Sequence, residues 1–170
     1  GAWKRVNRND AEGLCVVGSD LYVDFGTVGV YRYDGSALTK ITSNNGEDME
    51  AVGADLYVDF GSALGLYRYG DGVWKRVNAV SPEDMCAVGS TLYVDFGASY
   101  GLYQCDGASW KRISKLNPEG MAAAGTDLYV DFGVAGVWQY ASGMLKNASD
   151  LNAESLYGAG LNVYADFGAG

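Results

Sequence analysis

Short runs of apolar or alternating residues follow one another along the whole chain, and glycines or polar pairs separate them. Residues 85–88 form an apolar run that ends at Gly89, and residues 92–96 follow after two polar positions. Residues 102–105 and 110–113 continue the pattern, and the pair Asp106-Gly107 between them is typical of a tight reversal. The pattern therefore predicts a meander of four short antiparallel strands.

This pattern repeats five times. The phrase Tyr-Val-Asp-Phe-Gly, or Tyr-Ala-Asp-Phe-Gly in the last copy, recurs every 35 to 36 residues. Helical repeats of similar length need 3.6-residue periodicity, which these segments lack. Small four-stranded sheets must stack to bury their faces, and radial stacking predicts an all-β, five-bladed β-propeller. The copies of the phrase begin at Tyr22, Tyr57, Tyr93, Tyr129 and Tyr164.

We expect one domain over residues 1–170. The last repeat lacks residues for a third strand, and residues 3–6 carry the sequence of a fourth strand. We therefore expect the N-terminal strand to close the last blade, which is either short of a strand or covered by another chain, with self-association as one possible result. The expected units are residues 11–41, 46–77, 82–113, 118–147, and 153–170 completed by 1–7.

Composition narrows the choice of function. The 25 glycines, 13 tyrosines and 2 prolines suit many short strands joined by tight turns. The net charge of −9 opposes binding to nucleic acid or anionic lipid, and we expect no membrane span and no leader segment. Histidine, the usual catalytic base and the commonest metal ligand, is absent from the sequence. We expect no enzyme, no cofactor and no metal, and three free thiols at Cys15, Cys86 and Cys105.

Two acidic positions recur in every repeat. The first ends the second strand, and a carboxylate packed between blades needs hydrogen-bond donors. We expect a structural role for it, with Arg32, Arg68, Gln104, Gln139 or turn amides as donors, and ligand binding as the alternative. These aspartates are Asp24, Asp59, Asp95, Asp131 and Asp166.

The second acidic position lies in the turn before each inner strand. Five such carboxylates would form an axial ring that either caps the local turns or holds a cation or water. They are Glu12, Glu47, Glu83, Glu119 and Glu154.

Aromatic side chains offer another kind of site. They can pack between blades or stack on sugar rings in the grooves there. The candidates are Trp3, Trp74, Trp110, Trp138, Tyr33, Tyr69 and Tyr140.

The strands Leu-Tyr-Val-Asp-Phe-Gly, Gly-Leu-Tyr-Arg-Tyr and Trp-Lys-Arg-Ile resemble the compact bacterial propeller repeats of the kelch and tectonin kind. The five-fold count is similar to that of tachylectin-type lectins. The resemblance covers the architecture and transfers no binding residue. It implies a lectin-like recognition module whose partners are glycans or another protein. A structural or engineered scaffold without a ligand is the alternative.

Overall fold

The computed structural model describes residues 3–107 and 109–168, and they fold into strands joined by tight turns. Two short 3-10 helices, Gly26–Val28 (η1) and Gly133–Ala135 (η2), interrupt the strands. The chain divides into two compact units, Gly1–Ser81 and Pro82–Gly170, which we describe separately. None of the helices in the described ranges is long and apolar enough to span a membrane.

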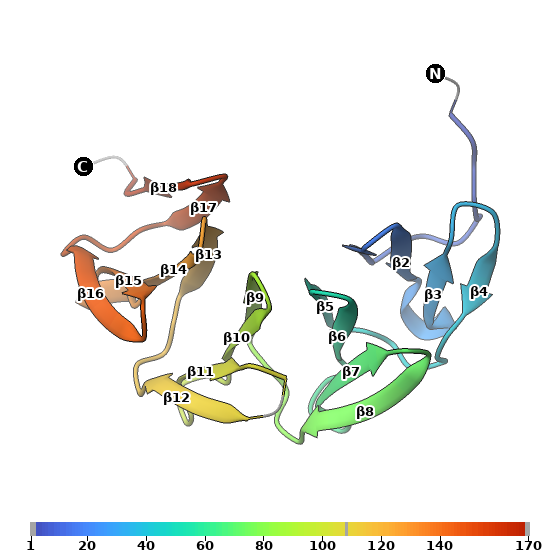
Figure 1. Cartoon of the computed structure of the whole chain (residues 1–170), viewed down its shortest axis with the longest axis horizontal. Helices are drawn as coiled ribbons and strands as arrows, with labels where there is room; N and C mark the ends of the chain where they lie inside the picture. Colours follow the sequence, from blue (N-terminus) through green and yellow to red (C-terminus); the bar gives the residue numbers. More distant parts are fainter. Residues whose placement is uncertain (1–2, 108, 169–170) are drawn as a thin grey trace. The chain divides into compact units, whose positions relative to one another are not determined.

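The first unit contains two four-stranded meanders, shown in blue to green in Figure 1. In each blade the strands pair in chain order and antiparallel. The first blade has β1 (Gly13–Val17), β2 (Asp20–Asp24), β3 (Val30–Tyr33) and β4 (Leu38–Lys40). The second blade has β5 (Asp48–Val52), β6 (Asp55–Asp59), β7 (Leu66–Gly70) and β8 (Val73–Asn78).

The second unit contains two more four-stranded meanders and a two-stranded sheet (Figure 1). The third blade has β9 (Asp84–Val88), β10 (Thr91–Asp95), β11 (Leu102–Cys105) and β12 (Trp110–Ser114). The fourth has β13 (Gly120–Ala124), β14 (Asp127–Asp131), β15 (Val137–Ala141) and β16 (Met144–Ser149). The fifth has β17 (Ser155–Ala159) and β18 (Asn162–Asp166).

Adjacent blades within a unit meet through their first strands, since β1 packs against β5, and β13 packs against β9 and β17. The second strands carry the most buried side chains, and Leu56, Leu92 and Leu128 are fully buried. Burying such a leucine contributes about 2 kcal/mol. The repeated phrase therefore lies at the centre of each complete blade.

A glycine follows each first strand because the turn into the second strand needs a positive φ at that position. A Cβ added to Gly18, Gly53 or Gly89 would meet open space, so close packing does not require glycine at these positions. Each has a φ of +61° to +63°, which suits the tight hairpin into the second strand. Crowding does apply at Gly158, where a Cβ would overlap the Ala123 carbonyl of the neighbouring blade.

The N-terminal segment differs from the expectation. Residues 3–6 form no strand, and the fifth sheet consists of β17 and β18 alone among the described residues. The expected short last blade is present. Its closure by the N-terminal segment stays a prediction.

Candidate functional site

The recurring aspartates all accept the same local hydrogen bond. In each blade the Oδ1 atom accepts the N–H of the glycine two residues later, at 2.8 to 3.1 Å. This bond fixes the turn that leaves the second strand. In the four complete blades the aspartate is only 1% to 2% exposed, whereas Asp166 in the two-stranded blade is exposed.

In the first two blades the second carboxylate oxygen of the aspartate reaches the loop that follows the blade. Asp59 Oδ2 accepts the Ser81 hydroxyl at 2.6 Å. Asp24 accepts the Gly46 N–H. The Asn45 side-chain amide, with its nitrogen turned toward this carboxylate, donates to Asp24 Oδ2 at 3.3 Å. These two carboxylates therefore join the turn of their own blade to the next segment of the chain.

The arginine and glutamine donors expected for these aspartates have other partners. Arg32 Nε donates to Asp20 Oδ2 at 2.6 Å, and Arg68 Nε pairs with Asp55 Oδ2 at 3.0 Å. The equivalent Gln139 donates to Asp127 at 2.7 Å. In the third blade the position of Asp20 is occupied by Thr91, and Gln104 accepts a bond from Tyr140. The turn amides are the expected donors that the structure confirms.

The glutamates turn toward their own blades. Each glutamate N–H donates to the carbonyl of the aspartate in the same blade, at 2.6 to 2.9 Å. Its carboxylate lies over the α-carbon of the glycine that ends the repeated phrase, so that a Cβ on that glycine would overlap the carboxylate. The glycines are Gly26, Gly61, Gly97, Gly133 and Gly168.

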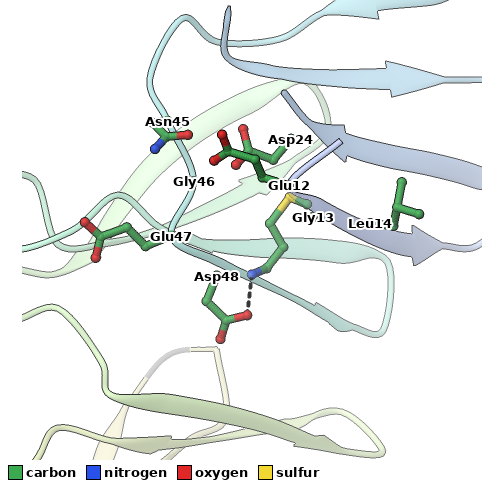
Figure 2. Close-up of a pocket in the computed structure, with 9 residues that line it drawn as sticks. Glu12, Gly13, Leu14, Asp24, Asn45, Gly46, Glu47 and Asp48 are labelled. Atoms are coloured by element: carbon green, nitrogen blue, oxygen red, sulfur yellow. Dashed lines mark hydrogen bonds between the residues drawn. The ribbon is translucent and has the colours of Figure 1, made fainter. Parts of the chain in front are cut away.

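An acidic pocket of about 350 Å³ lies beside these contacts in the first unit. Figure 2 shows the carboxylates of Glu12 and Asp24 near each other, with Glu47 and Asp48 on the neighbouring blade. Among the described residues, no group of three or more His, Cys, Asp or Glu side chains is placed to hold a metal ion. Each glutamate thus contacts the aspartate and the glycine of its own blade, and the binding of a cation by these glutamates stays a hypothesis.

Burial raises the pKa of the aspartates at the ends of the second strands in the four complete blades. The effect is largest for Asp95, whose pKa rises to about 6 because of burial and the nearby negative charges of Glu83 and Asp84. The hydrogen bond from the Gly97 N–H acts in the opposite direction and partly offsets this rise in pKa. Asp131 also accepts the N–H of Ala153, the residue before the glutamate of the next blade. The equivalent residue for Asp95 is Pro118, which has no N–H to donate.

Three of the four tryptophans pack within the blades. Trp74 lies 4.8 Å from the Tyr69 ring centre and donates from Nε1 to the Ile41 carbonyl at 3.2 Å. Trp110 packs on Phe96, and Trp138 donates to the Ala135 carbonyl. Trp3 is fully exposed. Tyr33 donates to the Gly35 carbonyl in its own turn.

The groove between the first two blades is the better candidate for binding. Its cavity of about 430 Å³ is within the range of small-molecule sites. The Arg32–Asp20 ion pair and the Tyr22 and Tyr69 rings line it, with the ring centres 6.2 Å apart. Sequence reasoning found Tyr69 but did not identify Asp20 as part of a site. The signal was present, because aspartate recurs there as Asp55 and Asp127.

The corresponding junction between the third and fourth blades is built differently. Tyr93 and Tyr140 keep the same edge-to-face contact, with ring centres 5.9 Å apart. Tyr140 is buried, and its hydroxyl donates to Gln104 Oε1 at 2.8 Å and accepts from Lys111 Nζ at 3.4 Å. These bonds tie the two blades together, so the two junctions are not equivalent.

Comparison with known proteins shows the fold. No protein-family profile and no curated protein sequence matches the chain. Similar solved structures include the GH74 xyloglucanase from Xanthomonas campestris (14% identity, TM-score 0.63) and the GH74 enzyme from Niastella koreensis (16%, 0.64). BBS1N in complex with ARL6DN is another (13%, 0.60).

In each of these three comparisons the match covers 88% of this chain. It covers 27%, 28% and 56% of the xyloglucanase, the Niastella enzyme and BBS1N, so the chain spans less than two thirds of each neighbour. With the strand order, these likenesses show an all-β fold of five β-propeller blades, the fifth having two strands.

Proposed function

We propose that the chain is a non-enzymatic recognition module that binds carbohydrate in the groove between its first two blades. The observation that carries the proposal is the Arg32–Asp20 ion pair beside the Tyr22 and Tyr69 rings in one open cavity. A guanidinium donates hydrogen bonds and a carboxylate accepts them. Together they suit neighbouring hydroxyl groups of a sugar, because each hydroxyl can both accept and donate. Tyrosine rings supply the apolar surface on which a sugar ring packs.

The charge of the groove favours an uncharged glycan. Arg32 is already paired with Asp20, and Asp71 adds a second carboxylate to the lining. The whole chain has a net charge of −9. An anionic sugar would therefore meet repulsion without a free cation in this groove to offset it. We infer that neutral glycans bind better than sulfated or uronate-containing ones.

The recurrence of the acidic residues supports a role without catalysis. Hydrolysis by two carboxylates needs one acid and one base in different environments. Here the glutamate N–H of every blade donates to the aspartate carbonyl, and every aspartate carboxylate accepts the N–H of the glycine two residues later. The GH74 neighbours are enzymes, but at 14% to 16% identity they share only the fold with this chain.

A structural scaffold is the second candidate. The Tyr140–Gln104 bond and the Trp74–Ile41 bond favour it, because they use side chains to hold adjacent blades together. The two functions differ in what they require of Arg32. A recognition module needs its guanidinium for the ligand, whereas a scaffold tolerates its replacement.

A broad array of immobilised neutral glycans, probed with protein shown to be folded by circular dichroism, tests the proposal. We expect selective binding that Arg32→Gln and Asp20→Asn each weaken at least tenfold in calorimetry with the best glycan. Arg76→Gln, at an exposed position outside the cavity lining, is the matched charge control and should bind like the parent. A flat array response from folded protein would refute carbohydrate binding and favour the scaffold.

A further inference from the structure

The fifth blade ends at a strand with an open edge. In each complete blade the second strand pairs with a first strand on one side and a third strand on the other. β18 pairs with β17, and the described residues provide no strand beyond it in that sheet. A strand edge with free N–H and C=O groups is a template for pairing with another chain.

The direction of the main-chain groups along β18 follows from its neighbours. The Glu154 N–H donates to the Asp166 carbonyl, so the polar groups of Asp166 face the β17 side. Successive residues of a strand present these groups to opposite sides. The groups of Ala165 and Phe167 therefore face the open edge. In the fourth blade Phe132 is equivalent to Phe167. Its N–H faces the third strand and donates, at 3.0 Å, to the carbonyl of Gly136, the residue before β15.

The structure contains four examples of the strand that covers this edge. In the fourth blade β14 pairs with β15 so that Val130 faces Trp138 and Tyr129 faces Gln139. Each third strand opens with an aliphatic residue that is 0% to 4% exposed, followed by an aromatic residue and then arginine or glutamine. The aliphatic residues are Val30, Leu66, Leu102 and Val137.

The fifth blade keeps the side chains that this strand would contact. Tyr164 and Phe167 correspond to Tyr57 and Phe60 of the second blade. They are 59% and 41% exposed, whereas Tyr57 and Phe60 are 2% and 7% exposed. The fifth blade thus presents an aromatic surface next to the open strand edge.

We propose that the edge of β18 binds an extended segment of a second polypeptide that has the third-strand pattern of this repeat. The segment adds to the sheet as an antiparallel strand, and its main-chain bonds form with Val163, Ala165 and Phe167. Where Asp127 accepts a bond from Gln139, the fifth blade has Asn162, an uncharged residue. The segment that fits best therefore has glutamine, rather than arginine, at its centre.

A labelled peptide that copies residues 136–143 (Gly-Val-Trp-Gln-Tyr-Ala-Ser-Gly) is the probe, and fluorescence anisotropy with the whole protein is the measurement. We expect saturable binding that Ala165→Pro weakens at least tenfold, because proline removes an N–H that faces the open edge. Ala165→Val is the matched control, since valine occupies this position in the other four blades. It should bind like the parent.

The peptide provides a second test that does not depend on the folding of the proline variant. A scrambled peptide, and one methylated on the main-chain nitrogen of Trp138, the residue that pairs with Val130 in the fourth blade, should both bind at least tenfold more weakly to the parent protein. Absence of binding by the copied peptide, or equal binding of the scrambled one, would overturn the proposal. Equal binding to a correctly folded Ala165→Pro protein would also overturn it.

Discussion

The Glu47 carboxylate lies over the α-carbon of Gly61, in the space that a side chain at position 61 would occupy. The two residues are also linked through Asp59, whose carbonyl accepts the Glu47 N–H and whose carboxylate accepts the Gly61 N–H. The absence of a side chain at Gly61 is therefore what allows the strand end and the turn before the first strand to pack closely.

Replacing Gly61 tests this contact. Gly61 and Gly72 both have a φ of +76°, but a Cβ on Gly72 would meet open space. We expect Gly72→Ala to lower the unfolding free energy by about 1 kcal/mol through backbone strain alone. Gly61→Ala should cost about 2 kcal/mol because it also displaces Glu47. Urea denaturation of both variants measures the difference.

A double-mutant cycle separates the two contributions at Gly61. In a Glu47→Ala background, the cost of Gly61→Ala should fall to that of Gly72→Ala, because the displaced carboxylate is gone. Equal costs of Gly61→Ala in the two backgrounds would show that the contact with Glu47 has no energetic weight.

Asp95 should make stability depend on pH. Its pKa rises from the ordinary 3.8 to about 6 in the folded protein, so the folded state holds this proton more tightly than the unfolded state. The resulting stability is complete below about pH 4 and is lost as the pH rises through about 6. We expect Asp95→Asn to reduce the fall in unfolding free energy between pH 4 and pH 6.5. An unchanged pH profile, measured by chemical denaturation, would contradict the assignment.

Pro118 should set part of the Asp95 pKa. Asp24 and Asp131 each accept an N–H from the residue before the glutamate of the following blade, and proline has none to offer. Pro118→Ala restores the donor, so we expect the pKa of Asp95 to fall. Carboxyl carbon NMR titration measures it. Asp131, which has its own donor at Ala153, provides the internal reference and should titrate as in the parent.

The Tyr140 hydroxyl should stabilise the second unit. It is the donor to Gln104 Oε1 across the junction between the third and fourth blades. We expect Tyr140→Phe to cost about 1 kcal/mol of unfolding free energy. The cost should shrink in a Gln104→Ala background. Tyr33→Phe, at the same repeat position in the first blade, removes a bond within one turn and should cost less. Thermal denaturation of the three single variants and the Tyr140→Phe/Gln104→Ala double variant would check this.

The strands were predictable because their signals are local. The expected third strand at residues 102–105 coincides with β11, and the expected second strand at 92–96 differs from β10 by one residue at each end. Alternation and turn glycines determine these elements without reference to the rest of the chain. The strands of the last blade were predictable for the same reason.

The partners of charged side chains were not predictable in the same way. Arg32 faces Tyr22 across the ladder, and both Asp20 and Asp24 lie two residues from Tyr22 on the same face. The sequence does not distinguish these two carboxylates. Asp24 already accepts the N–H groups of Gly26 and Gly46, which leaves Asp20 for the guanidinium. The contact of each glutamate with its glycine depends on the close approach of the carboxylate to the glycine α-carbon, which no short sequence pattern indicates.

The turn after the second strand has two lengths but one closing bond. In the first blade the Phe25 N–H donates to the Gly29 carbonyl at 3.1 Å, and in the second the Phe60 N–H donates to the Gly65 carbonyl at 3.0 Å across one more residue. The chain can therefore change length between these glycines while the ladder on either side keeps its register. A length change of one residue is therefore compatible with the blade in this loop, whereas the same change inside a strand would move its side chains to the opposite face of the sheet.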